Sequence, residues 1–304
     1  MRKALQRGLL VLLAAGVLAV PAVANGRALI YDQYRPDAGS DRRDGRDLDV
    51  VGLTTDGRLV RFDADRPGRT RNIGRVKGLK DGDQSLVGID YRVQDGNLYG
   101  VGNAGGIYTL NTRNASATKV SKLTQPLMGN AFGVDFNPAA NRLRVVSDAG
   151  QNLRHNIDDA AATTPPLAGM TAVDGTLTYP PATTPAAGIS GAAYTNNDLD
   201  ANTGTTLFDL DTMQDQVAVQ SPANNGLLAL TGKLLVDAGS SAGFDVYSRV
   251  SGGSTQGNQA FASLQTLGRY AFYQVNLLTG KITRVGSFQP GDQVFDIALP
   301  LDQS

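Results

Sequence analysis

The sequence predicts an all-β protein, a five-bladed β-propeller whose ring is closed by the C-terminal strand. Three observations support this prediction. A short motif recurs five times, each early copy opens a group of short alternating segments separated by turn residues, and the last copy stands alone at the C-terminus. The chain has 304 residues, a length that all-β folds often use for one domain, and its 36 glycines favour the many turns of such a fold.

The recurring motif reads Gly-x-Asp-aromatic in its two clearest copies. With its third position as the marker, the copies fall at residues 90, 135, 193, 245 and 296, so the intervals between them are 45, 58, 52 and 51 residues. A second landmark, an Asn that ends a hydrophobic segment, follows each of the first two markers by 21 residues, at Asn111 and Asn156. Two landmarks that keep the same spacing indicate a structural repeat.

The repeat that begins at residue 86 shows the expected content of one unit. Strands are predicted at 86–93, 98–101, 107–110 and 117–123, and Gln-Asp-Gly-Asn at 94–97 is typical of a hairpin turn. Four short antiparallel strands in about 40–50 residues are typical of a propeller blade.

The two ends of the chain complement each other. The N-terminal repeat has strands predicted at 50–54, 59–62 and 70–76 but no first strand with the marker, whereas the marker strand at 294–299 has nothing after it. If the last strand is the innermost strand of the first blade, the ring closes and its sheet edges are paired. The C-terminal strand is therefore expected to complete blade 1.

A six-bladed ring is the alternative. The stretch 160–187, rich in Ala, Thr and Pro, is expected to be a long loop, but a degenerate blade within 160–185 is compatible with the spacing. In the fourth repeat, 227–236 reads either as a fourth strand or as an extra hairpin.

The first 24 residues predict a signal peptide. Three basic residues within the first seven precede an apolar run at 8–20, and alanines at 22 and 24 occupy the positions that signal peptidase reads. The run is shorter than the ~20 residues that span a bilayer, so cleavage after residue 24 is expected, with an uncleaved anchor as the alternative. Residues 25–47 are then a flexible lead-in and 48–304 the propeller, in a secreted, periplasmic or cell-envelope protein without a membrane span.

Composition excludes several classes of function. The absence of Cys excludes a disulfide scaffold and a thiol nucleophile, and a single His argues against multi-histidine metal enzymes. Removal of residues 1–24 takes three basic residues from the 28 in the chain and leaves 25 against 28 acidic ones, a net charge of −3. This balance gives no bulk attraction to nucleic acid. The basic residues within 58–80 are expected on a solvated outer strand and loop.

Part of the chain resembles a known family. The segments concerned are Phe-Gly-Val-Asp-Phe-Asn-Pro at 132–138, Asn-Arg-Leu-Arg-Val-Val-Ser at 141–147, Gly-Gln-Asn-Leu-Arg at 150–154, Ala-Ala-Tyr-Thr-Asn-Asn at 192–197 and Thr-Leu-Phe-Asp-Leu-Asp at 206–211. From about residue 85 to 299, and most specifically over 131–248, the chain resembles the bacterial family catalogued as domain of unknown function 4394. The resemblance implies a secreted β-propeller-like domain, and it brings no established activity and no catalytic residues.

Four aspartates are the main candidate ligand-binding residues: Asp90, Asp135, Asp245 and Asp296. They hold the same place in four repeats, so they are expected to form a ring of carboxylates near the central channel. Such a ring suits a cation or an acid/base pair, because neighbouring like charges push pKa values apart. The alternative is architectural: each carboxylate accepts hydrogen bonds from the backbone N–H groups of a neighbouring turn.

A polar loop is the candidate metal site. Asp198, Asp200 and Asn202 place three oxygen-bearing side chains at alternate positions, and Asp209 is twelfth from the first of them. Hard cations prefer several oxygen ligands from one tight loop, which makes Ca²⁺ the one cofactor that the sequence suggests. The loop departs from the EF-hand pattern in its glycine position, its last acid and its lack of flanking helices. The alternative is a turn rich in Asn and Asp.

No catalytic residue is identified. His155, the only imidazole, lies in a predicted third strand near Ser147, Asp148 and Asp158, and we expect it to be a surface or half-buried strand residue rather than part of a triad. The Gly-x-Ser-x-Gly match at 239–243 leads into a predicted strand, whereas the nucleophile elbow leads into a helix.

Three classes of function remain. The favoured one is a binding or scaffold module that meets an extracellular glycan or an envelope protein with the loops at one end of the propeller. The alternative is a carboxylate-based hydrolase or lyase acting on carbohydrate at the channel, which requires two channel-facing carboxylates at glycosidase separation. The third is a structural part of a larger envelope assembly.

Overall fold

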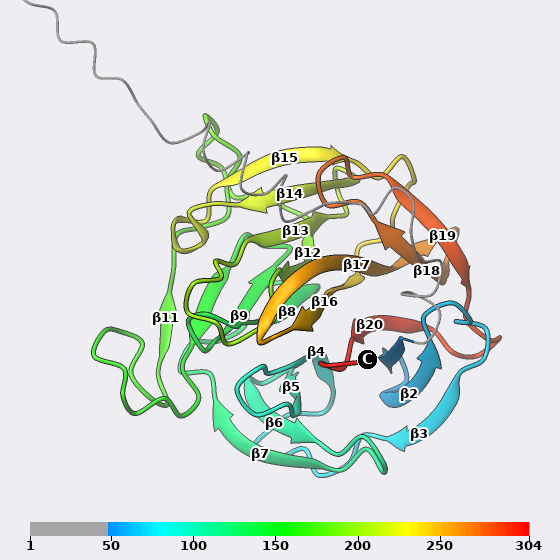
Figure 1. The fold of residues 1–304 in the computed structure, drawn as a ribbon, viewed down its shortest axis with the longest axis horizontal. Coiled ribbons are helices and arrows are strands. Elements are labelled where there is room, and N and C mark those ends of the chain that lie inside the picture. The colour runs from blue at the N-terminus through cyan, green and yellow to red at the C-terminus, as the bar shows by residue number, and fades with distance from the viewer. Residues whose placement is uncertain (1–47, 304) are drawn as a thin grey trace, which may run out of the picture. The chain divides into compact units, whose positions relative to one another are not determined.

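The computed structural model describes residues 48–303, which form five antiparallel four-stranded sheets arranged in a ring (Figure 1). Each sheet is one blade, so the predicted all-β, five-bladed propeller is confirmed. The signal peptide predicted at 1–24 and the lead-in predicted at 25–47 lie outside the described residues. No helix within 48–303 is long and apolar enough to cross a membrane.

Blade 1 joins the two ends of the described chain. Its strands, from the inside outwards, are β20 (Val294–Ala298), β1 (Asp49–Thr54), β2 (Arg58–Asp63) and β3 (Arg71–Arg75). β20 pairs antiparallel with β1, with Ile297 opposite Gly52 and Asp296 opposite Leu53. The predicted closure of the ring by the C-terminal strand is therefore confirmed.

The other four blades use consecutive strands, innermost first. Blade 2 consists of β4 (Leu86–Tyr91), β5 (Leu98–Gly102), β6 (Gly106–Leu110) and β7 (Ala117–Lys122), and blade 3 of β8 (Phe132–Asn137), β9 (Arg142–Ser147), β10 (Asn152–His155) and β11 (Thr171–Val173). Blade 4 consists of β12 (Ile189–Tyr194), β13 (Leu207–Asp211), β14 (Gln216–Gln220) and β15 (Leu228–Lys233). Blade 5 consists of β16 (Ala242–Ser251), β17 (Ser254–Thr266), β18 (Arg269–Val275) and β19 (Ile282–Ser287). One turn of 3₁₀ helix, η1 (Ala223–Asn225), lies between β14 and β15.

The six-bladed alternative is wrong. The stretch 160–187 contributes only the three-residue β11, which is the outermost strand of blade 3, and 227–236 contains β15, the outermost strand of blade 4. Five prolines between residues 165 and 185 explain why this stretch forms no sheet of its own. Proline cannot donate a backbone hydrogen bond to a strand ladder.

Hydrophobic cores lie between neighbouring blades. Between blades 1 and 5, the Phe62 ring meets the rings of Phe272 and Phe288 edge to face, with centroids 5.2 and 5.3 Å apart. Both faces of a middle strand are covered in this arrangement, so β5 has no exposed residue. The blades therefore stabilise one another around the ring.

The glycine of the repeated motif allows the inner strands to approach one another closely. A Cβ at Gly133 of β8 would lie 2.5 Å from the backbone N of Ala192, and a Cβ at Gly243 of β16 would lie 2.6 Å from the Cα of Asp296. Both are contacts with the innermost strand of the next blade. A side chain at either position would force the inner strands apart.

We expect Gly133→Ala to lower the free energy of unfolding by about 1–3 kcal/mol, the usual cost of overpacking. Gly204→Ala is the matched control, because Gly204 is exposed and a Cβ there meets nothing within 4 Å. Urea unfolding followed by circular dichroism compares the two. Equal unfolding midpoints for both variants would contradict the role given to the motif glycine.

Candidate functional site

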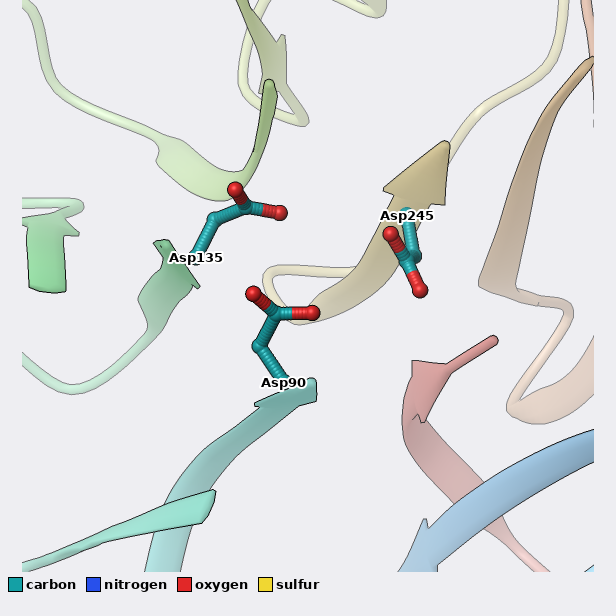
Figure 2. A group of neighbouring side chains, drawn as sticks. All are labelled: Asp90, Asp135 and Asp245. Carbon is teal, nitrogen blue, oxygen red and sulfur yellow. The ribbon is translucent and has the colours of Figure 1, made fainter. Parts of the chain in front are cut away.

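Three marker aspartates converge from three different blades at the centre of the ring. Asp90 of β4, Asp135 of β8 and Asp245 of β16 each place a carboxylate oxygen within 4.8 Å of the other two, and Figure 2 shows these side chains pointing towards one another. Asp296 of β20 holds the same motif position in blade 1, and Ala193 holds it in blade 4. All four carboxylates are buried, with residue exposures of 2–8 %.

Each carboxylate also binds backbone N–H groups of the neighbouring blade. The N–H donors are Ile89 to Asp296 (2.7 Å), Phe136 to Asp90 (2.8 Å), Tyr194 to Asp135 (3.2 Å) and Leu299 to Asp245 (2.5 Å). The first three donors lie within the inner strand of the next blade, and Leu299 directly follows β20. The aspartates therefore link successive blades, and the link from blade 4 is missing because that blade has Ala193.

The four carboxylates have no basic partner in the described part of the chain. Within residues 48–303, none of the ion pairs involves any of the four carboxylates. Burial raises the pKa of Asp90, Asp135 and Asp296 well above the usual value, and repulsion between the carboxylates raises each pKa further. Burial also raises the pKa of Asp245 to about 7. Such a group must hold protons or a cation, because isolated buried charge is too costly.

The spacing of the three oxygens suits a calcium ion. Three points no more than 4.8 Å apart fit inside a circle whose radius is that length divided by √3, so one position lies within about 2.8 Å of all three oxygens. Calcium–oxygen distances are about 2.3–2.6 Å and those of magnesium about 2.0–2.1 Å. The three carboxylates could therefore supply three of the six to eight oxygen ligands that Ca²⁺ takes. We call Asp90, Asp135 and Asp245 the carboxylate cluster.

A model of a domain of unknown function, DUF4394, matches residues 58–298. The chain belongs to this family. No curated protein matched the sequence. The resemblance noted from about residue 85 to 299 is thus confirmed for this DUF4394 protein.

Solved structures resemble the DUF4394 chain at low identity. A protein from a study of the de novo evolutionary emergence of a symmetrical protein is 14 % identical, with a TM-score of 0.49, and the match covers 84 % of this chain and 100 % of that one. A Lactobacillus plantarum protein is 13 % identical, with a TM-score of 0.38, and the match covers 84 % of this chain and 99 % of that one. An auxiliary nutrient binding protein from Bacteroides thetaiotaomicron is 12 % identical, with a TM-score of 0.42. That match covers 84 % of this chain and 64 % of the other protein. The fold assignment rests on the strand pairing rather than on these likenesses.

The predicted calcium loop of the DUF4394 chain contacts the hairpin of the next blade. Asp198 accepts hydrogen bonds from the Thr255 backbone N–H and hydroxyl at 2.8 and 2.6 Å, and Asp200 accepts one from the Ser254 hydroxyl. Asn202 donates its backbone and side-chain N–H groups to Asp200. Protein donors thus already engage these two carboxylates, and the calcium site at Asp198, Asp200 and Asn202 stays a prediction.

Asp209, the twelfth residue counted from Asp198, lies apart from this loop in the middle of β13. Its side chain is fully buried, and neither carboxylate oxygen has a hydrogen-bond partner within residues 48–303. Burial raises its pKa well above the usual value, although the nearby Arg144 opposes this shift. Asp209 is therefore a cost to the folded state at neutral pH.

We expect Asp209→Asn to raise the free energy of unfolding at pH 8 by about 1–3 kcal/mol, the desolvation cost of an unsatisfied buried group. A pKa that is higher in the folded state than the unfolded value of about 3.9 means that stability is lost as pH rises above about 4. The gain should therefore shrink at pH 4. Urea unfolding at both pH values measures it, with the exposed Asp237→Asn as the control. A less stable Asp209→Asn variant at pH 8 would count against this reading.

His155 is buried, and the expectation of a surface or half-buried residue is wrong. Its Nε2 lies 2.8 Å from the Ser121 Oγ and its Nδ1 lies 2.9 Å from the Thr171 Oγ1, so it joins β7 of blade 2 to β11 of blade 3. Burial lowers its pKa to about 4, so the ring is neutral at pH 7. The aspartates near it in sequence bind elsewhere: Asp158 pairs with Arg92, and Asp148 accepts from the Asn130 N–H.

Two other sequence features have structural roles. The 239–243 segment leads into β16, so the helix of a nucleophile elbow is missing there. Basic residues within 58–80 lie on β2, β3 and the adjoining loops, and several pair with aspartates, as Arg58 does with Asp292 at 2.9 Å and Arg66 with Asp63 at 3.2 Å. Charged outer strands also discourage pairing with another chain.

Proposed function

We propose that this DUF4394 propeller is a secreted or cell-envelope binding module that holds a calcium ion in the carboxylate cluster. The observation that carries the proposal is the convergence of Asp90, Asp135 and Asp245 from three blades, buried and without a basic partner in the described residues. A bound divalent cation neutralises these carboxylates, which must otherwise be protonated. Asp296 adds negative charge next to the cluster.

The bound ion has a structural consequence in this proposal. Blades 2, 3 and 5 each supply one carboxylate, so a single ion connects sheets that are far apart in sequence. Calcium then stabilises the ring on which the connecting loops are mounted, and these loops meet the partner, an extracellular glycan or an envelope protein. Binding of the partner is expected to depend on calcium through this rigidity.

The carbohydrate hydrolase alternative gains no support from the geometry. Glycosidases place two carboxyl groups about 5–5.5 or 6.5–9.5 Å apart on either side of the scissile bond. Here the oxygens of the cluster lie within 4.8 Å of one another, on residues that are at most 6 % exposed. Both the close approach of these oxygens and their burial differ from that arrangement.

Thermal unfolding with 1 mM calcium and with a chelator tests the proposal. A ligand at one hundred times its Kd stabilises the folded state by about 2.7 kcal/mol. For a domain of this size the expected rise in Tm is about 5 °C or more. The rise should be larger at pH 8 than at pH 5, because carboxyl groups with raised pKa values hold protons at pH 5 and calcium must displace them. Equal melting curves at pH 8 in calcium and in chelator would overturn the proposal.

A further inference from the structure

One inner strand is much longer than the others. β4, β8, β12 and β20 end one or two residues beyond the marker position, whereas β16 continues for six residues beyond Asp245, to Ser251. At about 3.3 Å per residue, the extra four residues project about 13 Å beyond the ends of the other inner strands. In Figure 1 the hairpin of β16 and β17 extends towards the middle of the ring. We call residues 249–257, its far end, the strap.

The strap is less buried than the strand from which it extends. None of its nine residues is buried, in contrast to the preceding segment 242–248, in which every residue is buried. The pairing of β16 with β17 shifts register between Arg249 and Val250, at the base of the strap. A segment without buried residues opens locally at a low free energy, and a bulge weakens the ladder where it begins.

Two carboxylates fasten the strap to blade 4. Asp198 accepts two hydrogen bonds from Thr255, and Asp200 accepts one from Ser254. Beside them, Asn197 donates to the Ser248 Oγ at the base of the strap. Removal of the two aspartates leaves the strap without these fastenings.

A short segment of blade 4 leads from the carboxylate cluster to the fastening. The segment 194–198 begins with the Tyr194 N–H on the Asp135 carboxylate and continues to Asn197, whose side chain donates to the carbonyl of Val246, the residue after Asp245. Asp198 follows at once. The strap is thus fastened one residue beyond a segment that contacts two of the three cluster strands.

We infer that the strap is a hinged cover at the end of the ring axis beyond which β16 projects. Asp198 and Asp200 latch this cover, which controls how fast a cation enters and leaves the carboxylate cluster. The inference rests on the proposed calcium site for its functional part. Because the strap does not coordinate the ion, it changes the rates of binding and release together and leaves the affinity unchanged. The acidic loop at 198–202 is then a latch.

Hydrogen exchange followed by mass spectrometry tests the cover without any cation. In the wild type, the amides of 249–257 should exchange at least about tenfold faster than those of β18. In Asp198→Ala/Asp200→Ala the amides of 249–257 should exchange at least about tenfold faster than in the wild type, because each lost hydrogen bond to a charged group contributes about 1.5–3 kcal/mol. Asn202→Ala, which changes the same loop but no contact with the strap, is the control. Ser254→Ala/Thr255→Val removes the two hydroxyl donors of the latch from the strap side if the double aspartate variant does not fold. Strap exchange as slow as that of β18 would overturn the cover, whatever calcium does.

Calcium release into a fluorescent chelator, measured by stopped flow, tests the control of access. The latch variant should release calcium about tenfold faster than the wild type at an unchanged Kd. Faster strap exchange with an unchanged release rate would overturn the control of access. A fast-exchanging strap in a protein that binds no calcium would overturn the proposed function, so the two failures are distinguishable.

Discussion

Deletion of residues 294–304 is expected to abolish cooperative folding. β20 is the innermost strand of blade 1, and Val294, Ile297 and Leu299 are at most 3 % exposed. Burial of each large aliphatic side chain contributes about 1.5–3 kcal/mol, so their joint loss is comparable with the 5–15 kcal/mol by which a typical domain is stable. The deletion also leaves β1 unpaired along one edge and removes Asp296.

Circular dichroism melting and the dispersion of amide NMR signals measure this outcome. The control is a chain that stops after Leu301, which keeps β20 and loses the bonds of Gln303 to Asp49 and Tyr247. That control should melt cooperatively at a moderately lower temperature. Addition of a peptide of residues 291–304 to the longer deletion should restore folding. A cooperative, wild-type melt of the longer deletion would show that ring closure does not hold the fold together.

Asp135→Asn is expected to have opposite effects without and with calcium. In a chelator at pH 8 the variant should be more stable than the wild type by about 1–3 kcal/mol, because it removes a buried charge while its amide oxygen still accepts the Tyr194 N–H. The pKa of Asp135 is raised by folding, so the wild type loses stability as pH rises above the unfolded value, and the gain of the variant should be smaller at pH 4. In calcium the variant should gain no further stability.

Asp296→Asn is the matched control. Asp296 has a similar burial, a raised pKa and one hydrogen bond to the next blade, but it lies outside the carboxylate cluster. Its variant should also be more stable in chelator and should still respond to calcium. If both variants respond to calcium as the wild type does, the ion does not bind at the cluster.

The fold was readable from the sequence because the repeat has an obvious period and a lone last copy. The position of the marker aspartates on the innermost strands followed from the same repeat, since equal places in equal blades meet at the ring axis. Backbone N–H donors to these carboxylates were expected from a neighbouring turn, whereas the donors lie on or directly after the inner strand of the next blade. The short strand β11 was missed because three residues in a stretch rich in Pro carry no periodicity.

Burial was the least predictable property. Asp209 and His155 lie in strands whose two faces are both covered by neighbouring blades, so polarity and alternation do not reveal which face is exposed. His155 is satisfied by Ser121 and Thr171, which are 34 and 16 residues away in sequence. The loop at 198–202 has the composition of a cation loop, but Asp198 and Asp200 accept hydrogen bonds from Thr255 and Ser254 in the hairpin of blade 5. These partners are more than 50 residues away in sequence, so the sequence does not reveal them.

Isothermal titration of calcium into the folded chain at pH 8 tests the central proposal most directly, with Asp90→Asn and Asp198→Asn measured beside the wild type. We predict one calcium ion per chain in the wild type and in Asp198→Asn, and no binding in Asp90→Asn. Binding that is lost in Asp198→Asn and kept in Asp90→Asn would place the ion in the 198–202 loop and contradict a cation site at the centre of the ring.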